Sequence, residues 1–506
     1  MSDYFIGVDS GTQGTKAVLM EGKTGRVLAQ AGSSYGFLPL TEPGVKEQHP
    51  KTWVAALEKT VKEVVTRSGV NPAQIKALGI SGQQHGMVAL DEKGKVIRPA
   101  KLWCDTSTAA QADAIVKKMG GLKKLVALTG NGLPAGFTAS KIAWLKQVEP
   151  EHYRKTATFL LPHDYLNYHL TGKLSMEAGD ASGTGLLDTK TRNWHPKMIA
   201  AIDPALEQKL PAIQQSCDPV GTVLPMVAKR MGLEPTTLVS AGGGDNMMGA
   251  IGTGNTKVGV VTASLGTSGT VYAYSSRPVV DSTGEIAAFC DSTGGWLPLV
   301  CTMNVTFASE VIRNLFGMDH AALSQAVDSV PCGAGGLLHL PYFQGERMPN
   351  IPNATAVYFG MTAENTTPAH MARAVMEGVA FGLNYGLDRM KDLGIRPKEI
   401  RVTGGGSNSP AWRRILASVF EADVVEMQNK EGAAFGAALQ ALWCHRLQRG
   451  ERVRITHVTD ELVKIDAKSV AKPDRQAVKL YRQYQTLHNS LSSACLPIFD
   501  QHQSVR

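Results

Sequence analysis

A short glycine- and threonine-rich motif occurs twice in this chain. The first copy is DSGTQGT at residues 9–15, and the second is SLGTSGT at residues 264–270. Each copy lies between two apolar runs, and this arrangement predicts a β-hairpin with a polar tip. Two such hairpins so far apart indicate a chain of two related halves, each of which begins with the same structural unit.

The residues of the first tip suit a bound phosphate. Glycine lets the backbone approach a ligand and adopt a positive φ, and threonine hydroxyls and exposed N–H groups suit phosphate oxygens. Asp9 ends the first apolar run, where its carboxylate could hold a hard cation such as Mg²⁺ through water. The alternative interpretation of this motif is a surface hairpin with a solvated aspartate.

A second pair of motifs supports the two-half interpretation. Residues 242–246 read GGGDN, and residues 404–408 read GGGSN. The first half has the carboxylates Asp9 and Asp245 where the second half has serines. We therefore expect the first half to provide the acid–base and metal-binding groups, and the second half to bind a nucleotide.

Asp245 follows a predicted strand at residues 238–241 and precedes a helix that begins near Asn246. A helix N-terminus favours an ionised carboxylate, but aspartate is also a preferred N-cap residue, so a purely structural role stays open. The glycine motifs lie farther apart in the first half (11 to 242) than in the second (266 to 404). We therefore expect an insertion within residues 100–230 that builds a substrate pocket.

Apolar periodicity and turn residues predict the remaining elements. A polar run, SGQQHG at residues 81–86, follows the apolar strand 75–80, and such a run often lines a site in an open α/β sheet. The alternative for this run is that its histidine is structural, with its hydrogen bonds made within the protein. For the loop with Glu346 and Arg347, the alternative to a functional role is a structural ion pair. The other predicted elements are a three-stranded meander at 4–31, helices at 51–68, within 107–155, at 368–393, at 411–420 and from 431, strands at 257–263, 270–274, 286–290, 296–301 and 400–403, and a helical tail from about 470.

Composition excludes several classes of protein. The net charge of +8 is scattered along the 506 residues and forms no basic stripe, so we expect no nucleic-acid partner. No apolar run approaches about 18 residues, and no signal peptide precedes the first predicted strand, so we expect no membrane partner. The seven cysteines form no CxxC motif, which is typical of a reducing cytoplasm.

The doubled hairpin resembles the phosphate-binding elements of the actin and hexokinase superfamily. The glycine motifs and the stretch 342–347 (YFQGER) resemble the FGGY family of carbohydrate kinases, from Phe5 to about Trp443. Within that family, the branch that phosphorylates D-xylulose is similar at 79–86, 102–105, 129–138, 161–166 and 242–246. The resemblance implies an α/β fold of two ribonuclease H-like domains around a deep cleft: a sugar-binding domain at 1–254, an ATP-binding domain at 255–490, and a tail at 491–506.

The resemblance also implies roles for single residues. Asp245 would be the general base that takes the proton from the C5 hydroxyl of the sugar, and Asp9 would orient Mg²⁺. The implied sugar contacts are Gln84, His85, Trp103, Asp105 and Asn246. The implied ATP and phosphate contacts are Thr12, Gln13, Gly266, Thr267, Gly404, Gly405, Gly406 and Asn408.

Three positions depart from the pattern of the branch. Gln84 stands where methionine is common, Cys104 where asparagine is common, and Ser107 near a usual arginine. These departures leave another pentulose, an aldonate or a deoxy sugar open as the acceptor. A separate alternative is a nucleotide-gated sugar-binding protein without catalysis, against which the presence of both Asp9 and Asp245 argues. Neither half contains the Walker motif GxxxxGK[ST], so the sequence excludes a P-loop kinase. The resemblance leaves a homodimer open.

Overall fold

The computed structural model describes residues 2–39 and 42–505, which form two compact units. The first unit comprises residues 1–257, 274–298 and 431–463, and the second comprises 258–273, 299–430 and 464–506. The chain first leaves the first unit close to the predicted boundary after residue 254. Two later segments, 274–298 and 431–463, return to pack with the first unit.

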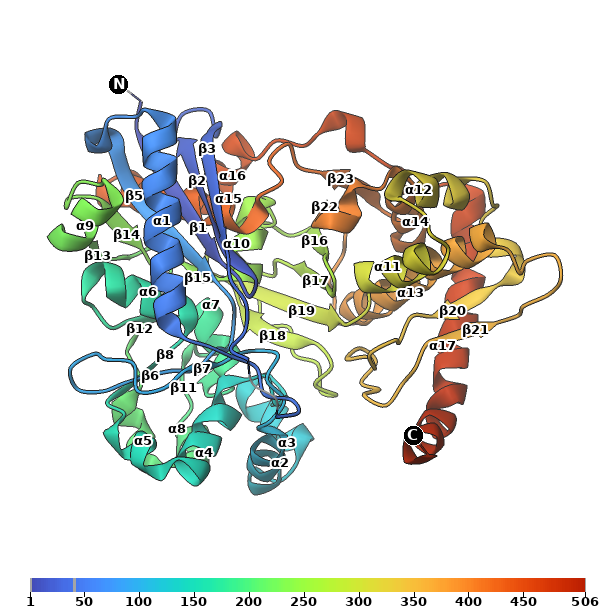
Figure 1. The fold of residues 1–506 in the computed structure, drawn as a ribbon, viewed down its shortest axis with the longest axis horizontal. Helices are drawn as coiled ribbons and strands as arrows, with labels where there is room; N and C mark the ends of the chain where they lie inside the picture. The colour runs from blue at the N-terminus through green and yellow to red at the C-terminus, as the bar shows by residue number, and fades with distance from the viewer. Residues whose placement is uncertain (1, 40–41, 506) are drawn as a thin grey trace. The chain divides into compact units, whose positions relative to one another are not determined.

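The sheet of the first unit has the strand order β13-β14-β5-β1-β2-β3, and β15 pairs with β5. Strands β1, β2 and β3 are antiparallel, which confirms the predicted meander, while β5 is parallel to β1 and to β14. Helix α1 packs on β2 and β3 (Figure 1) and buries Trp53 and Leu57 against them. The bounds are β1 (Tyr4–Ser10), β2 (Gly14–Glu21), β3 (Val27–Ser34), α1 (Pro50–Ser68), β5 (Ile75–Gly82), β13 (Pro219–Thr222), β14 (Leu238–Ser240) and β15 (Gly243–Gly244).

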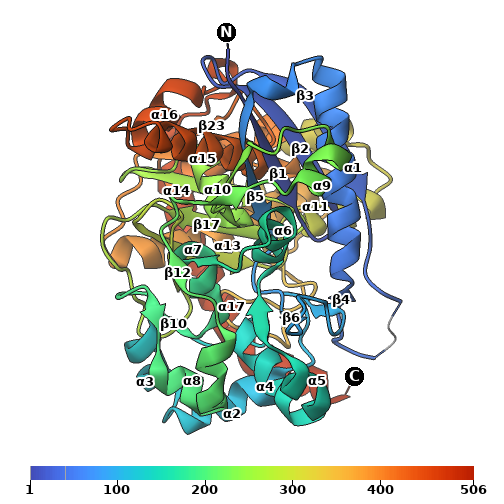
Figure 2. The same cartoon turned by 90° about the vertical axis from the view of Figure 1, so that its left-hand side faces the viewer.

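A long segment separates β5 from β14 in this unit. Figure 2 shows that α2, α3, α4, α5 and α8 of this segment gather at one end of the unit. The segment contains β6 (Val88–Leu90), β7 (Ala100–Lys101), α2 (Ala109–Lys118), α3 (Leu122–Thr129), α4 (Thr138–Val148), α5 (Pro150–Lys155), β8 (Thr158–Leu160), α6 (Pro162–Thr171), β9 (Met176–Glu177), α7 (Ala178–Ala181), β10 (Leu187–Asp188), β11 (Asn193–Trp194), α8 (Pro196–Ile202), β12 (Ile213–Gln214) and α9 (Pro225–Met231).

The second unit repeats the plan of the first. Its sheet has the order β18-β19-β17-β16-β22-β23, in which β16, β17 and β19 are antiparallel and β22 and β23 continue in parallel with β16. The hairpin motif therefore lies at the same topological position in both units. The bounds are β16 (Val260–Leu265), β17 (Gly269–Ala273), β18 (Ala287–Cys290, counted with the first unit), β19 (Trp296–Thr302), β22 (Glu399–Thr403) and β23 (Asp423–Glu426).

The triple-glycine motifs, in contrast, are not equivalent. Residues 404–406 follow β22, the neighbour of β16, and so correspond to the residues after β5. Residues 242–244 follow β14, one strand farther from β1. The predicted pairing of the two motifs is therefore wrong, because glycine recurs wherever a backbone needs space. The segment between the corresponding strands is longer in the first unit: residues 83–237 separate β5 from β14, whereas the short 3-10 helix Gly405–Asn408 and α14 (Pro410–Phe420) separate β22 from β23.

Helices cover the sheet of the second unit and extend beyond it. Helix α13 packs against α11, α12 and α14, and the C-terminal helix α17 packs on α14 and α13. The predicted helical tail is confirmed. The bounds are α11 (Thr306–Leu315), α12 (His320–Asp328), β20 (Leu338–Leu340), β21 (Val357–Phe359), α13 (Pro368–Asp392), α16 (Ile455–Leu462, in the first unit) and α17 (Arg475–Val505).

Helix α15 (Gly432–Gln448) returns to the first unit and packs on α10 (Asp245–Gly252) and on β1 and β5. The contact is as close as backbone allows: a Cβ at Gly436 would lie 1.8 Å from the carbonyl oxygen of Met248, and one at Gly252 would lie 1.8 Å from that of Gly432. The close packing predicted from the small residues of this helix is confirmed.

We expect Gly436→Ala to destabilise the protein by about 3 kcal/mol, because the added methyl group must push α15 away from α10. Gly382→Ala in α13 is the matched control, since a Cβ there meets nothing within 4 Å. Alanine should stabilise that helix by about 0.5–1 kcal/mol. Thermal and urea unfolding of the two variants should move in opposite directions, and equal shifts would contradict the packing described here.

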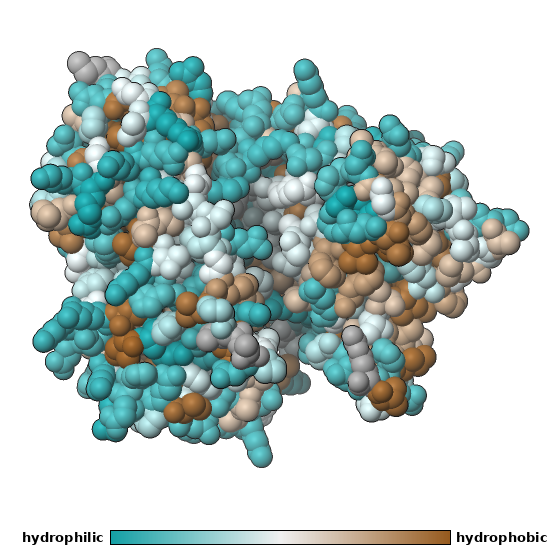
Figure 3. All heavy atoms as spheres, in the orientation of Figure 1, coloured by the Kyte–Doolittle hydropathy of each residue, from teal (hydrophilic) through white to brown (hydrophobic). Residues whose placement is uncertain are grey.

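Hydrophilic side chains cover most of the visible face of the first unit, whereas hydrophobic ones gather over α11 in the second (Figure 3). Leu315, at the end of α11, is among the exposed large hydrophobic residues, as are Phe359 and Met361. Within residues 2–39 and 42–505, no helix is both long enough and apolar enough to cross a membrane.

Candidate active site

Three parallel strands of the first unit end at one edge of its sheet. Asp9 on β1 is in register with Ser81 on β5, and Ser81 is in register with Gly243 on β15. Asp245 follows β15 directly. Asp9 and Asp245, 236 positions apart in the chain, are therefore brought to the same sheet edge on opposite sides of β5.

A hydrogen bond holds the carboxylate of Asp9 at this sheet edge. The hydroxyl of Ser81 donates a hydrogen bond of 2.7 Å to its Oδ1. Burial raises the pKa of Asp9 above its ordinary value, in spite of this hydrogen bond and of the charge of Lys16. No cluster of three or more His, Cys, Asp or Glu side chains suited to a metal occurs in the described part of the chain. A single carboxylate fits magnesium, which usually keeps several waters and binds phosphates as well.

Asp245 is the first residue of α10, and the N-cap position belongs to Gly244. The N-cap interpretation of Asp245 is therefore wrong. Its Oδ1 accepts hydrogen bonds from the backbone N–H (2.9 Å) and the side-chain amide (3.0 Å) of Asn246. Burial, followed by the negative charges of Asp9 and Asp180, raises the pKa of Asp245 to about 7. A carboxylate with such a pKa can accept a proton near neutral pH.

The charge of Asp180 belongs to a buried group to which the sequence assigned no role, although two of its members lie in the run 161–166. His163 lies between two carboxylates, with its Nδ1 2.7 Å from Asp180 and its Nε2 3.0 Å from Asp164. Burial alone would lower the pKa of His163, but the two carboxylates outweigh burial and raise it well above its usual value. A Cβ at Gly82 would lie 2.8 Å from the Cβ of His163, so this group packs directly beneath the end of β5.

Gln84 and His85 follow β5 at the same edge. The Oε1 of Gln84 accepts a hydrogen bond of 2.9 Å from Asn246, which fixes the amide, while its buried Nε2 has no partner among the described residues. His85 adopts a positive φ of 63°, which is uncommon for a residue other than glycine. Its ring packs against that of Phe137 at a tilt of 38°, with the ring centroids 4.6 Å apart. The structure thus brings the predicted sugar contacts Gln84, His85 and Asn246 close to Asp245.

The predicted hairpin tip is present between β1 and β2. Gly11 and Gly14 do not have a positive φ, contrary to expectation; Gly14 is required instead because a Cβ there would lie 2.8 Å from the carbonyl oxygen of Ser33 on β3. The Tyr35 hydroxyl donates to the carbonyl of Gly11 (2.8 Å), and its backbone N–H donates to that of Gln13. These bonds tie the loop to the residue that follows β3.

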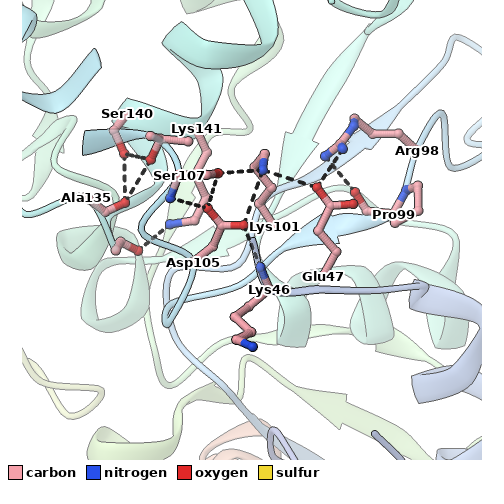
Figure 4. A network of polar contacts seen from close by, with 12 residues as sticks. Lys46, Glu47, Arg98, Pro99, Lys101, Asp105, Ser107, Ala135, Ser140 and Lys141 are labelled. Atoms are coloured by element: carbon pink, nitrogen blue, oxygen red, sulfur yellow. Dashed lines mark hydrogen bonds and ion pairs between the residues drawn. The ribbon is translucent and has the colours of Figure 1, made fainter. Parts of the chain in front are cut away.

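Trp103 lies against this loop, since its Nε1 donates a hydrogen bond of 2.9 Å to the hydroxyl of Thr12. The predicted phosphate loop and a predicted sugar contact are thereby in direct contact. The segment that carries Trp103 is held by a buried polar network (Figure 4), in which Lys101 contacts both Glu47 and Asp105 at 3.2 Å. Arg98 also pairs with Glu47, at 2.7 Å.

Asp105 is fully buried within this network. Its Oδ2 accepts from the backbone N–H of Lys46 (2.9 Å) and its Oδ1 from the N–H and hydroxyl of Ser107. Both oxygens are therefore engaged by groups of the chain itself. Figure 4 shows Asp105 between Lys101, Lys46 and Ser107, where its carboxylate supports the segment on either side of Trp103.

The nucleotide contacts predicted in the second half, at 266–267 and 404–408, lie together in the second unit. Ser264 on β16 is in register with Thr403 on β22, so the tip after β16 adjoins the glycines after β22. A Cβ at Gly404, whose φ is +86°, would lie 2.7 Å from the carbonyl oxygen of Leu265. This approach explains why only glycine suits that position. Thr267, Gly404, Gly405 and Asn408 are exposed, whereas Gly266 is half-buried and Gly406 buried.

Hydrogen bonds from backbone and amide groups hold Glu346, and among the described residues its carboxylate has no ion pair of the kind that was the alternative for this loop. Its carboxylate accepts hydrogen bonds from the backbone N–H groups of Met303 (2.7 Å) and Arg347 (2.8 Å) and from the side chain of Asn304 (3.2 Å). The side chain thus ties the 341–349 loop to the end of β19.

Sequence reasoning assigned no individual role to the supports of the site, which include Tyr35, Gln48, Ser81, Gln83 and His163. Ser81 and Gln83 lie in the polar run after β5, which was a usable signal. Tyr35 and Gln48 lie in a segment without a motif, so only the tertiary structure reveals them.

Comparison with known proteins identifies both halves of the chain. Residues 4–252 match the N-terminal domain of the FGGY family of carbohydrate kinases, and residues 261–445 match the C-terminal domain of that family.

Three relatives illustrate the similarity. The xylulose kinase of Haemophilus influenzae is 40% identical over 94% of this chain and 97% of its own length, and that of Streptomyces coelicolor is 36% identical over 86% and 87%. The crystal structure of xylulose kinase from Bifidobacterium adolescentis superposes with a TM-score of 0.81, at 32% identity, over 96% of this chain and 99% of that chain.

Proposed function

We propose that this chain, which belongs to the FGGY family of carbohydrate kinases, transfers the γ-phosphoryl group of ATP to D-xylulose and forms D-xylulose 5-phosphate. As a carbohydrate kinase it is a phosphotransferase with an alcohol group as acceptor, and ATP is its phosphoryl donor. The choice of D-xylulose is supported by the xylulose kinases that are similar to it over most of its length.

The observation that carries the proposal is the pair of carboxylates at one sheet edge, Asp9 and Asp245. Phosphoryl transfer needs positioning, neutralisation of charge and a base for the attacking hydroxyl. Asp245, with a pKa of about 7, is suited to be that base, and Asn246 orients its carboxylate. A binding protein without catalysis would have no use for a carboxylate held in this state.

The remaining residues are proposed to position the substrates. Gln84 directs its buried amide toward a sugar hydroxyl, and His85, Trp103 and Asn246 line the same pocket, with Asp105 fixing the segment of Trp103. Asp9 would hold magnesium, which when bound neutralises charge on the transferring phosphoryl group. The loop with Thr12 and Gln13 in the first unit, and those with Gly266, Thr267, Gly404, Gly405, Gly406 and Asn408 in the second, would bind the phosphates and adenosine.

A coupled assay of ADP release, run on a panel of pentuloses, pentitols and aldonates, tests the proposal. We expect ADP release that depends on D-xylulose and on Mg²⁺, at a rate well above the rate without sugar. Preference for another pentulose or for gluconate would replace the proposed acceptor but keep the reaction. ADP release that no sugar increases would overturn the kinase assignment.

The pKa of Asp245 predicts how the activity depends on pH. A general base acts only when deprotonated, so kcat/KM for the sugar should fall about tenfold for each pH unit below about 7 and level off above it. The sign follows from the raised pKa: acid protonates Asp245 and abolishes its function. The measurement is the initial rate between pH 5.5 and 9 with the coupling enzymes in excess, and a flat profile down to pH 5.5 would contradict the role.

A further inference from the structure

The Thr12 hydroxyl lies at one end of a chain of hydrogen bonds that leads into the core of the first unit. It donates to Oε1 of Gln83 (3.2 Å), and Nε2 of Gln83 donates to Oε1 of Gln48 (3.0 Å). The same Oε1 accepts from Nε1 of Trp53 (2.8 Å). Trp53, Gln48 and Gln83 are almost fully buried, so water does not compete for the two hydrogen bonds that join them.

Trp53 determines which group donates and which accepts in each of these hydrogen bonds. An indole Nε1–H can only donate, so the atom of Gln48 that it meets must be the oxygen. Gln83 must then present its amide nitrogen to that oxygen, which leaves its own oxygen facing Thr12. An amide oxygen only accepts, so the single proton of the Thr12 hydroxyl is committed to Gln83.

The acceptor role of the Thr12 hydroxyl oxygen is determined in the same way. Nε1 of Trp103 can only donate, and it lies 2.9 Å from the Thr12 oxygen, which must therefore accept. Gln48 also donates from Nε2 to the carbonyl oxygen of Thr12 (2.7 Å), so the backbone and the side chain of Thr12 are both held. A hydroxyl with one proton cannot donate to Gln83 and to a phosphate at the same time.

We propose that the Thr12 hydroxyl is a positioning group for Trp103, and that the hairpin binds phosphate without the proton of this hydroxyl. Phosphate would then be held by backbone N–H groups of the loop, while the hydroxyl sets the orientation of the indole on the sugar side. This inference rests on the proposed function in one respect, the place of Trp103 in the sugar pocket.

Three variants separate the two roles of Thr12. Thr12→Val keeps the shape and removes the hydroxyl, Thr12→Ser keeps the hydroxyl, and Trp103→Phe keeps an aromatic ring but removes the indole N–H. With the best sugar of the panel, Thr12→Val and Trp103→Phe should each raise the KM for sugar about 2- to 10-fold, the range expected for one hydrogen bond. The KM for ATP should stay within about twofold. Thr12→Ser, which keeps the hydroxyl, should raise the KM for sugar less than Thr12→Val does. The double variant Thr12→Val/Trp103→Phe should be no worse than either single variant, because both substitutions remove the same hydrogen bond.

A readout that needs no substrate tests the contact itself. In ¹⁵N-labelled protein the seven tryptophans give indole N–H signals, and the signal of Trp103 is the one that Trp103→Phe removes. We expect Thr12→Val to shift this signal and to speed its hydrogen exchange severalfold, with Thr12→Ser unchanged. This result stands even if no sugar is phosphorylated, so failure of the proposed function and failure of this inference are distinguishable.

Two results would overturn the inference. The first is a rise in the KM for ATP in Thr12→Val that Trp103→Phe does not share, since that pattern belongs to a phosphate ligand. The second is an indole signal of Trp103 that does not respond to Thr12→Val, since the indole would then be positioned by other groups.

Discussion

Replacing Asp245 with asparagine is expected to lower kcat for sugar phosphorylation by about 10²- to 10⁴-fold, the usual contribution of a general base. Asparagine has nearly the same shape, and its carbonyl oxygen can still accept the hydrogen bonds of Asn246. The change therefore removes the proton acceptor and little else. Affinity for ATP, measured by calorimetry without sugar, should be nearly unchanged. The same outcome is expected for Asp245→Ala.

Asp113→Asn is a suitable control for this variant, because Asp113 is an exposed aspartate of α2 within the same unit. It should retain the activity of the parent. If Asp245→Asn instead lost affinity for ATP and kept its kcat, Asp245 would be a nucleotide contact, and the assignment of the base would be wrong.

Asp9→Asn is expected to reduce kcat/KM at least about a hundredfold, because neutralisation of phosphoryl charge by a cation contributes several kcal/mol and about 1.4 kcal/mol corresponds to a factor of ten. Unlike Asp245→Asn, it should raise the concentration of Mg²⁺ needed for half-maximal rate. A titration of the initial rate with Mg²⁺ at saturating ATP distinguishes the two carboxylates, although they lie at the same sheet edge.

Ser81→Ala is a milder change at the same site than Asp9→Asn. It removes the hydroxyl that donates to Oδ1 of Asp9 at 2.7 Å but leaves the carboxylate in place. We expect a smaller loss of activity and a smaller rise in the Mg²⁺ requirement. An Asp9→Asn enzyme with the Mg²⁺ dependence of the parent would remove Asp9 from the metal site.

Local patterns predicted the elements well, and the reason is that they depend on neighbours in sequence. The spacing of Trp53 and Leu57 predicts α1, and Ser409 with Pro410 predicts the start of α14, where the structure has Ser409 accepting from the N–H of Trp412. The predicted equivalence of the triple-glycine motifs was wrong, because a glycine indicates only that the backbone needs space at that point. It does not indicate which strand of the sheet precedes it.

The division into units was likewise beyond local patterns. Helix α15 is distant in sequence from β1 and α10, yet it packs on both, and only the absence of a Cβ at Gly7, Gly252 and Gly436 allows this. A sequence shows that these residues are small. It does not show which backbone each of them faces.

By itself, the sequence determined that the chain has two related halves, that each begins with a glycine hairpin, and that its motifs are those of a carbohydrate kinase, because these properties reside in short runs of residues. The tertiary structure alone decided that Asp9 and Asp245 share a sheet edge and that Thr12 contacts both Gln83 and Trp103. Strand register and side-chain hydrogen bonds join residues that are far apart in the chain, and no local pattern encodes those partners.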